Sequence, residues 1–456
     1  MHARSLVLFA IFALAMTPHT LARAAESAGW KAGVAKIVIT PERPMWMSGY
    51  SSRDHAAEGK LHDLWAKALV LEDAAGQRAV LVTLDLVGID RLLSLSVRDA
   101  LEKNYGLTKR QIAINCSHTH TGPVVSHNLR TMYSLDEQQS RLVDEYTAAL
   151  EKKIIALVGE AIQNLAPAAI SWGGGETSFA VNRRNNPEPD VPALIAEGKL
   201  KGPVDHQVPV LAVNDAGGKL KTVVFGYACH ATALSFYQWT GDWPGFAMID
   251  LEKEHLGTVA MFWAGCGADQ NPLPRRTVEL AEKYGHEMAT AVDQVLAGEM
   301  TPIAGKLSES YAEIDLSFAT LPTREELTAQ AASNDKYQAA RAKMLLAQIA
   351  AGKPLSPTYP YPVQVWRLGN GPVFVTLGGE VVVDYALRLE QEYPNERMWV
   401  AGYTNDVMAY IPSRRVLTEG GYEGAGAMVY YGLPTAWAPD VEEKIIREVH
   451  QQIGKP

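Results

Sequence analysis

Two patterns of apolar and polar residues alternate along the chain. Short apolar runs rich in β-branched residues are typical of buried or half-buried strands, and longer segments with apolar residues at helical spacing are typical of amphipathic helices. We expect strands at Ala35–Ile39, Ala68–Leu71, Ala79–Leu84, Gln111–Asn115, Val208–Val213, Thr222–Tyr227, Val259–Trp263, Val363–Trp366, Val373–Leu377 and Met398–Ala401. We expect helices at Leu92–Asn104, Asp136–Gln163, Thr277–Leu296, Arg324–Ala351, Val381–Gln391 and Val441–Ile453.

This order of elements predicts an α/β fold, in which mixed β-sheets are flanked by helices within a single large domain. The segment Arg324–Ala351 is polar and rich in alanine, so we expect it to lie on the surface. The segment Asn185–Pro203 combines proline, glycine and charged residues, which predicts an excursion loop.

The N-terminal segment has the features of an export signal. Arg4 precedes the apolar run Leu6–Met16, which is too short to span a bilayer, and Ala22-Arg23-Ala24 fits a cleavage site. We therefore expect residues 1–24 to be a signal peptide and residues 25–456 to form the exported domain. The protein is expected in the periplasm or outside the cell.

Charge and cysteine content narrow the classes of function. The 456 residues carry a formal net charge of −9 and no Lys/Arg-rich run, which argues against binding to nucleic acid. The three cysteines, Cys116, Cys229 and Cys266, allow at most one disulfide bond, so we expect small buried thiols rather than a disulfide framework.

Polar residues follow four of the predicted strands. They are His118 and His120, then His230, then Asp269, Gln270 and Asn271, and finally Glu380 after Gly378-Gly379. Side chains at positions i and i+2 of an extended strand point to the same face, so His118 and His120 should project together. Strand ends are where sites collect in α/β folds, and two imidazoles with a carboxylate are the ligands of a catalytic zinc ion.

Each of these residues alone has an ordinary structural interpretation. The prediction of a metal site depends on their recurrence at four strand ends. A glutamate after Gly-Gly, for example, is a common first-turn residue of a helix. The sequence contains no Gly-x-Ser-x-Gly, His-Glu-x-x-His or Walker motif that would point to another chemistry. The aromatic segment "FYQWTGDWPGF" belongs by default to a core, with the wall of an acyl pocket as the alternative.

Six segments in order resemble the neutral/alkaline (non-lysosomal) ceramidase family, from about Gly33 to Tyr431. They are "GVAKIVITPERPMWMSGYSSR", "HTHTGP", "VNRRN", "CHATALSFYQWTGDWPGFA", "GGE" and "YTNDVMAYIPSRRVLTEGGYEGAGAMVYYG". The resemblance implies one zinc ion per chain. The residues that match the family's zinc ligands are His118, His230, Glu380 and Tyr410.

The resemblance also implies further roles in the active site. His120 matches a second active-site histidine that we expect to move a proton, and Arg183 and Tyr422 are expected to hold developing charge. Tyr431 is expected to contact substrate. The family's active-site serine is replaced here by Asp269 or Gln270, depending on a one-residue shift, and we count both as catalytic candidates. Asp269 is expected either to act as an additional base or to orient a ligand histidine, with an ordinary turn residue as the alternative. We expect no counterpart of the family's C-terminal immunoglobulin-like domain.

The sequence therefore predicts a zinc-dependent amidohydrolase in which a zinc-activated water cleaves an N-acyl amide. The expected substrate is a ceramide-like lipid or a related small N-acyl compound, with peripheral membrane contact and no stable protein partner. Two alternatives stay open. One is a zinc hydrolase of a non-lipid amide, peptide or ester, and the other is a binding protein that kept the fold without turnover.

Overall fold

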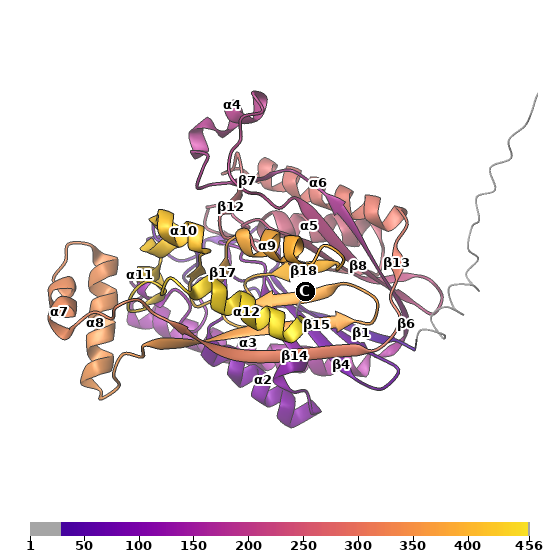
Figure 1. Ribbon diagram of the computed structural model, residues 1–456, viewed down its shortest axis with the longest axis horizontal. Coiled ribbons are helices and arrows are strands. Elements are labelled where there is room, and N and C mark those ends of the chain that lie inside the picture. Colours follow the sequence, from indigo (N-terminus) through magenta and orange to yellow (C-terminus); the bar gives the residue numbers. More distant parts are fainter. Residues whose placement is uncertain (1–28, 455–456) are drawn as a thin grey trace, which may run out of the picture.

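The computed structural model describes residues 29–454, so the expected signal peptide, residues 1–24, lies outside the described residues. A large mixed sheet forms the centre of the molecule (Figure 1). Its strands are β1 (Lys31–Val38), β3 (Trp65–Glu72), β4 (Arg78–Leu84), β5 (Ile112–Cys116), β6 (Ala166–Glu176), β8 (Gln207–Asp215), β9 (Leu220–Tyr227), β11 (Val259–Ala264) and β13 (Thr301–Pro302). Their order is β11-β9-β8-β6-β1-β3-β4-β5, with β13 paired to β6.

A second sheet has the order β14-β15-β16-β18. These strands are β14 (Leu307–Ser317), β15 (Thr358–Leu368), β16 (Val373–Leu377) and β18 (Met398–Ala401). Three short pairs complete the strands of the described residues, namely β2 (Gly59–Lys60) with β10 (Gln238–Trp239), β7 (Ala180–Asn182) with β12 (Gln270–Pro272), and β17 (Glu380–Val381) with β19 (Tyr410–Ile411).

Six of the eleven helices in the described residues cover the outer faces of these two sheets. The eleven helices are α2 (Arg91–Tyr105), α3 (Glu137–Gln163), α4 (Val191–Ala196), α5 (Asp242–Glu254), α6 (Val278–Ala297), α7 (Arg324–Ala331), α8 (Lys336–Ala350), α9 (Asp384–Glu392), α10 (Arg414–Glu419), α11 (Met428–Tyr431) and α12 (Val441–Ile453). Apolar side chains of α2, α3, α5 and α6 pack on the first sheet, and those of α9 and α12 pack on the second. In Figure 1, α4 and the α7–α8 hairpin project from the body of the molecule.

Strand β3 shows how the layers are held together. Ala66, Ala68 and Val70 point into the core beneath the helices, whereas Leu69 and Leu71 point into the core between the two sheets. A strand that is buried on both faces needs a continuous apolar run, which is why these strands were visible in the sequence. The predicted α/β fold with mixed sheets and flanking helices is confirmed.

Curvature of the first sheet brings its two edge strands together. Asn115 of β5 accepts a hydrogen bond from the backbone nitrogen of Ala264 in β11 at 2.9 Å, although the two strands lie at opposite ends of the strand order. The Asn115 amide also donates to the carbonyl of Gly402 at 2.8 Å, just after β18. Asn115 therefore links the ends of strands from both sheets through hydrogen bonds.

One predicted helix was wrong. The segment Arg324–Ala351 is not continuous, because it divides into α7 and α8. The first helix ends at Ala331, and Asp335 begins the second, since its carboxylate accepts hydrogen bonds from the backbone nitrogens of Tyr337 and Gln338. Such an N-cap stabilises a helix start and is incompatible with a position inside a helix.

Strand β6 was missed, since its three consecutive glycines are atypical of a strand. The structure explains two of them by the close approach of α6. A Cβ atom at Gly173 or Gly175 would lie 2.7 Å from the side chain of Val295. Among the described residues, no helix combines the length and apolar character needed to cross a membrane.

Candidate metal centre

Four chain segments meet where the edge strands β5 and β11 converge. His118 follows β5, His230 follows β9, and Glu380 follows β16. The parallel pair of β17 with β19 sets Glu380 directly beside Tyr410. The structure thus brings together the four residues that the resemblance assigns to zinc, and all four are buried.

Backbone carbonyl groups orient the two ligand histidines. His118 Nδ1 lies 2.6 Å from the carbonyl oxygen of Val87, and His230 Nδ1 lies 2.7 Å from that of Gly267. A carbonyl oxygen only accepts, so each Nδ1 carries a proton, and the Nε2 atom of each neutral imidazole presents a lone pair. Burial, followed by the charge of Arg183, lowers the pKa of His230 to about 4. This histidine is therefore neutral near pH 7, as metal binding requires.

The carboxylate of Glu380 faces these two lone pairs. Its Oε2 atom lies 3.0 Å from His118 Nε2 and 3.2 Å from His230 Nε2. Oε2 is buried and, apart from these two imidazole nitrogens, has no hydrogen-bond partner among the described residues. With both imidazoles neutral, three acceptor atoms face one another and repel unless a cation lies between them, so this donor set fits a divalent metal ion. The other oxygen, Oε1, accepts a hydrogen bond from the hydroxyl of Tyr431.

His120 lies beside this group. Its Nε2 atom is 3.1 Å from His118 Nε2, and the ligand nitrogens of His118, His120 and His230 lie within 4.8 Å of one another. The pKa of His120 is lowered well below its usual value, chiefly by burial and then by the neighbouring histidines. A neutral imidazole at this distance is close enough either to bind the same ion or to exchange a proton with a group bound there.

His118 reaches this position through an unusual backbone conformation. Its φ of 59° lies in the left-handed region, so the extended geometry that we predicted for His118 and His120 is wrong, although the two rings do meet. Tyr403, which the sequence reading missed, has a φ of 53° and packs its ring 4.5 Å from that of His118. Left-handed non-glycine residues are strained and cluster at functional sites, a signal that only coordinates reveal.

Arg183 and two tyrosines, Tyr410 and Tyr422, lie beside the centre. Arg183 Nη2 donates to Tyr410 Oη at 3.0 Å, and Arg183 Nη1 lies 3.4 Å from His230 Nε2. The Tyr422 ring packs edge-on against that of Tyr410 at 5.2 Å. The pKa of Tyr410 is raised well above its usual value, by burial first and then by Glu380. Without a bound cation, Tyr410 is therefore a neutral phenol.

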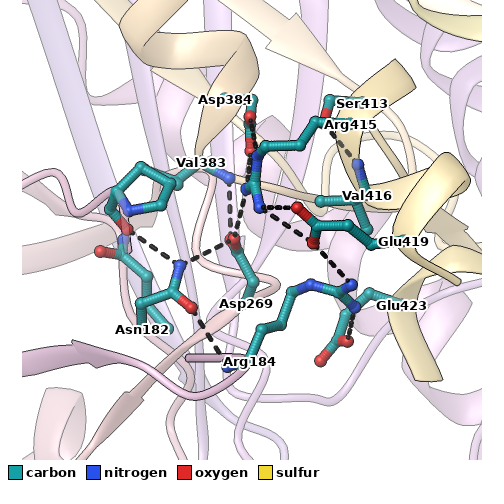
Figure 2. Close-up of polar contacts among 12 residues, drawn as sticks. Asn182, Arg184, Asp269, Val383, Asp384, Ser413, Arg415, Val416, Glu419 and Glu423 are labelled. Atoms are coloured by element: carbon teal, nitrogen blue, oxygen red, sulfur yellow. Dashed lines mark hydrogen bonds and ion pairs between the residues drawn. The ribbon is translucent and has the colours of Figure 1, made fainter. Parts of the chain in front are cut away.

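Glu423, another residue that sequence reasoning missed, anchors Arg183. Its carboxylate accepts from Arg183 Nε at 2.7 Å and from Arg184 Nη1 at 2.6 Å. Arg184 also pairs with Glu419 at 3.0 Å, and Glu419 pairs with Arg415 at 3.1 Å (Figure 2). The segment "YEG" contains Glu423 next to Tyr422, but nothing in its pattern shows which arginine it faces.

Asp269 and Gln270, the two candidates for the missing serine, turn away from the metal centre. Asp269 accepts from the Val383 backbone nitrogen at 2.9 Å and from the Asn182 amide at 3.2 Å (Figure 2). The Gln270 amide donates to the carbonyl of Ala228. In the described structure, both side chains hold together the segments that carry Arg183, His230 and Glu380. Their predicted catalytic roles stay predictions.

The three cysteines are small buried thiols, as the sequence predicted. Cys116, Cys229 and Cys266 are buried and unbridged.

A buried group of neutral imidazoles and a carboxylate at strand ends of an α/β sandwich defines a candidate metallohydrolase centre. The sequence matches the neutral/alkaline non-lysosomal ceramidase family, N-terminal part, over residues 30–344. The chain belongs to this family, as its motifs indicated.

Individual relatives are distant. The neutral ceramidase of Pseudomonas aeruginosa is 25% identical over 335 residues, which are 67% of this chain and 47% of the relative. Neutral ceramidase 3 of Arabidopsis thaliana is 29% identical over 169 residues, 34% of this chain and 22% of the relative. The chain thus spans about half the length, or less, of these curated relatives.

Solved structures show the same fold. The crystal structure of neutral ceramidase from Pseudomonas aeruginosa superposes with a TM-score of 0.71 at 22% identity, over 94% of this chain and 75% of that chain. A ceramidase complexed with C2 gives a TM-score of 0.72 at 20% identity, with 94% and 76% coverage.

Proposed function

We propose that this protein is a metal-dependent hydrolase of N-acyl amide bonds. The observation that carries the proposal is the buried Glu380 carboxylate, whose Oε2 faces the Nε2 atoms of two imidazoles. Ceramidase relatives support the amide as the bond that is cleaved. We also propose that the protein is exported, with residues 1–24 as its signal peptide.

Four side chains would hold the ion, a zinc ion in our proposal. They are His118, His230, Glu380 and Tyr410. When bound, zinc polarises a carbonyl group and lowers the pKa of water. Tyr431 keeps the Glu380 carboxylate in place by donating to Oε1. Such supporting hydrogen bonds orient a ligand and strengthen its hold on the metal.

The remaining residues act on the substrate. His120 is neutral and within reach of the centre, so its Nε2 can accept a proton from water and return it to the leaving nitrogen. Arg183 and Tyr422 lie on the Tyr410 side and can donate hydrogen bonds to an oxygen that gains negative charge. No serine nucleophile is needed in this scheme.

Metal content and turnover test the proposal together. We expect the purified protein to contain one zinc ion per chain and to release amine from short N-acyl amides. The variant His118→Ala should lose both properties, while the matched variant His127→Ala, at an exposed histidine, should keep both. A correctly folded native protein that binds no divalent metal would refute the proposal. A metal-loaded protein without amidase activity would leave a binding protein as the better description.

A further inference from the structure

A polar cavity of ≈ 500 Å³ opens beside the candidate metal centre. Three arginines, three glutamates and two asparagines line it, and Leu273 and Tyr422 are its only large apolar side chains. The polar lining residues are Arg183, Arg184, Asn186, Glu188, Asn271, Arg275, Glu419 and Glu423. Pockets for apolar ligands are lined mainly by hydrophobic and aromatic side chains, so this cavity does not suit an alkyl chain.

One lining residue of the cavity, Arg183, also contacts a proposed metal ligand. Arg183 Nη1 lies 3.3 Å from Asn271 Oδ1 and 3.4 Å from His230 Nε2. Tyr422 lines the same cavity and packs against Tyr410. A substrate whose scissile amide lies at the metal therefore has room for one of its two arms in this cavity.

At the rim of the cavity, the lining residue Arg275 shares a single carboxylate with Arg276, which neighbours it in sequence and is not itself a lining residue. Glu188 lies 2.6 Å from Arg275 Nη2 and 3.6 Å from Arg276 Nε. The hydrogen bond from Arg275, and then the charges of Arg275 and Arg276, lower the pKa of Glu188 despite its partial burial. Each guanidinium has five N–H donors, so one carboxylate leaves several of them free for another anion.

Arg276 also lies near Tyr50, an aromatic residue that packs against His120. Its side chain is 44% exposed, and its guanidinium carbon lies 5.8 Å from the ring centre of Tyr50. The Tyr50 ring in turn packs 4.8 Å from that of His120. A substrate anion bound at Arg276 would therefore lie near the group that is proposed to move the proton.

The aromatic segment that could have supplied an acyl pocket does not line this cavity. Trp239 and Trp243 are buried in the core beneath the helices. Trp243 Nε1 donates to the carbonyl of His230 at 2.9 Å, so this side chain supports the ligand loop instead.

We propose that the substrate is a polar N-acyl compound with an anionic group, such as a carboxylate, that Arg275 and Arg276 bind at the rim of the cavity. Such a compound would be preferred over a two-chain lipid. This inference rests on the proposed function, because it names the class of amide that the hydrolase cleaves.

The test compares substrates that differ in charge. N-hexanoylglycine is anionic, N-hexanoylethanolamine is a neutral analogue of similar length, and ceramide in mixed detergent micelles represents the lipid class. The half-amide of succinic acid with butylamine carries the carboxylate on the acyl arm. We expect kcat/KM for the better of the two anionic amides to exceed that for the neutral amide and for ceramide about tenfold or more, as one charge-assisted hydrogen bond allows.

A variant of Arg276 tests whether this side chain causes the preference for anionic amides. Arg276→Gln should raise KM for the anionic amide about tenfold more than KM for the neutral amide. Arg324→Gln removes an equally charged, exposed arginine on α7 and should change neither value. Equal effects of Arg276→Gln on both substrates, or a preference for ceramide, would overturn the inference.

Calorimetric titration of the anionic amides into metal-free protein separates this inference from the proposed function. Binding that Arg276→Gln weakens supports the anion site even in a protein without turnover. Failure to hydrolyse any of the four amides would refute the proposed function. Hydrolysis of the neutral amide without binding of the anionic ones would refute only the substrate class.

Discussion

Replacing Glu423 by glutamine should destabilise the protein far more than any other change in the arginine network. The Glu423 side chain is 5% exposed and is the carboxylate that holds Arg183 and Arg184, at 2.7 Å and 2.6 Å. An amide retains a single oxygen, so its nitrogen would face one of the two guanidinium groups donor to donor. Breaking a buried ion pair by removing one partner costs about 3–5 kcal/mol, and we expect a loss in this range.

Glu419 provides the matched control. It pairs with Arg184 and Arg415 in the same network, but its side chain is 42% exposed. Ion pairs at the surface contribute about 0–1 kcal/mol, so Glu419→Gln should lower the unfolding free energy by no more than that. Urea denaturation followed by fluorescence measures both values, and urea is chosen because guanidinium salts would screen the charges.

The pH dependence gives the sign of the effect. Burial alone would raise the pKa of Glu423, but Arg183 and its hydrogen bond lower that pKa below the usual value of 4.5. A lowered pKa in the folded state stabilises the protein above the unfolded pKa, and this contribution is lost as the pH falls through the folded pKa. The difference between wild type and Glu423→Gln should therefore be full at pH 7 and shrink below about pH 4.5. Equal losses for the two variants, or a difference that does not change with pH, would refute the reasoning.

Three further predictions concern the metal centre. Tyr431→Phe removes the donor to Glu380 and should weaken zinc retention about 10–100-fold, measured by competition with a chelator; unchanged retention would show that this hydrogen bond does not support the ligand. Gly49→Ala places a Cβ 2.5 Å from the His120 ring at a φ of +97°, and should lower turnover and cost about 1–3 kcal/mol of stability in the same urea assay. Dialysis against a chelator should lower Tm, and zinc at about 100 times its Kd should restore about 2.7 kcal/mol of stability; an unchanged Tm would contradict the assigned ligand set.

Much of the candidate site could be predicted from the sequence, because local patterns of apolar and polar residues identify it. Apolar runs buried on both faces identify the strands, and polar residues directly after those runs identify the strand ends. The pair His118 and His120, the histidine after β9 and the glutamate after Gly-Gly were found in this way. The motifs around them identified the family.

Other parts of the site depend on residues that are distant in sequence. Arg183 and Glu423 are 240 positions apart and still share a hydrogen bond. Asp269 and Gln270 stand in the segment that resembles the family's serine loop, yet their side chains bond to other parts of the interior. Which way a side chain points from a turn depends on backbone angles that residue type alone does not determine.

The sequence by itself determined most of the long strands, the chemical nature of the ligands and the family of this protein, because burial and residue type act locally. Only the tertiary structure decided that these ligands meet. The first sheet curves until β5 and β11 lie together, and Asn115 joins them through the backbone of Ala264. The curvature of this sheet comes from the twist that accumulates from strand to strand across a wide sheet. Twist of this kind is a property of the assembled strands and not of any segment alone.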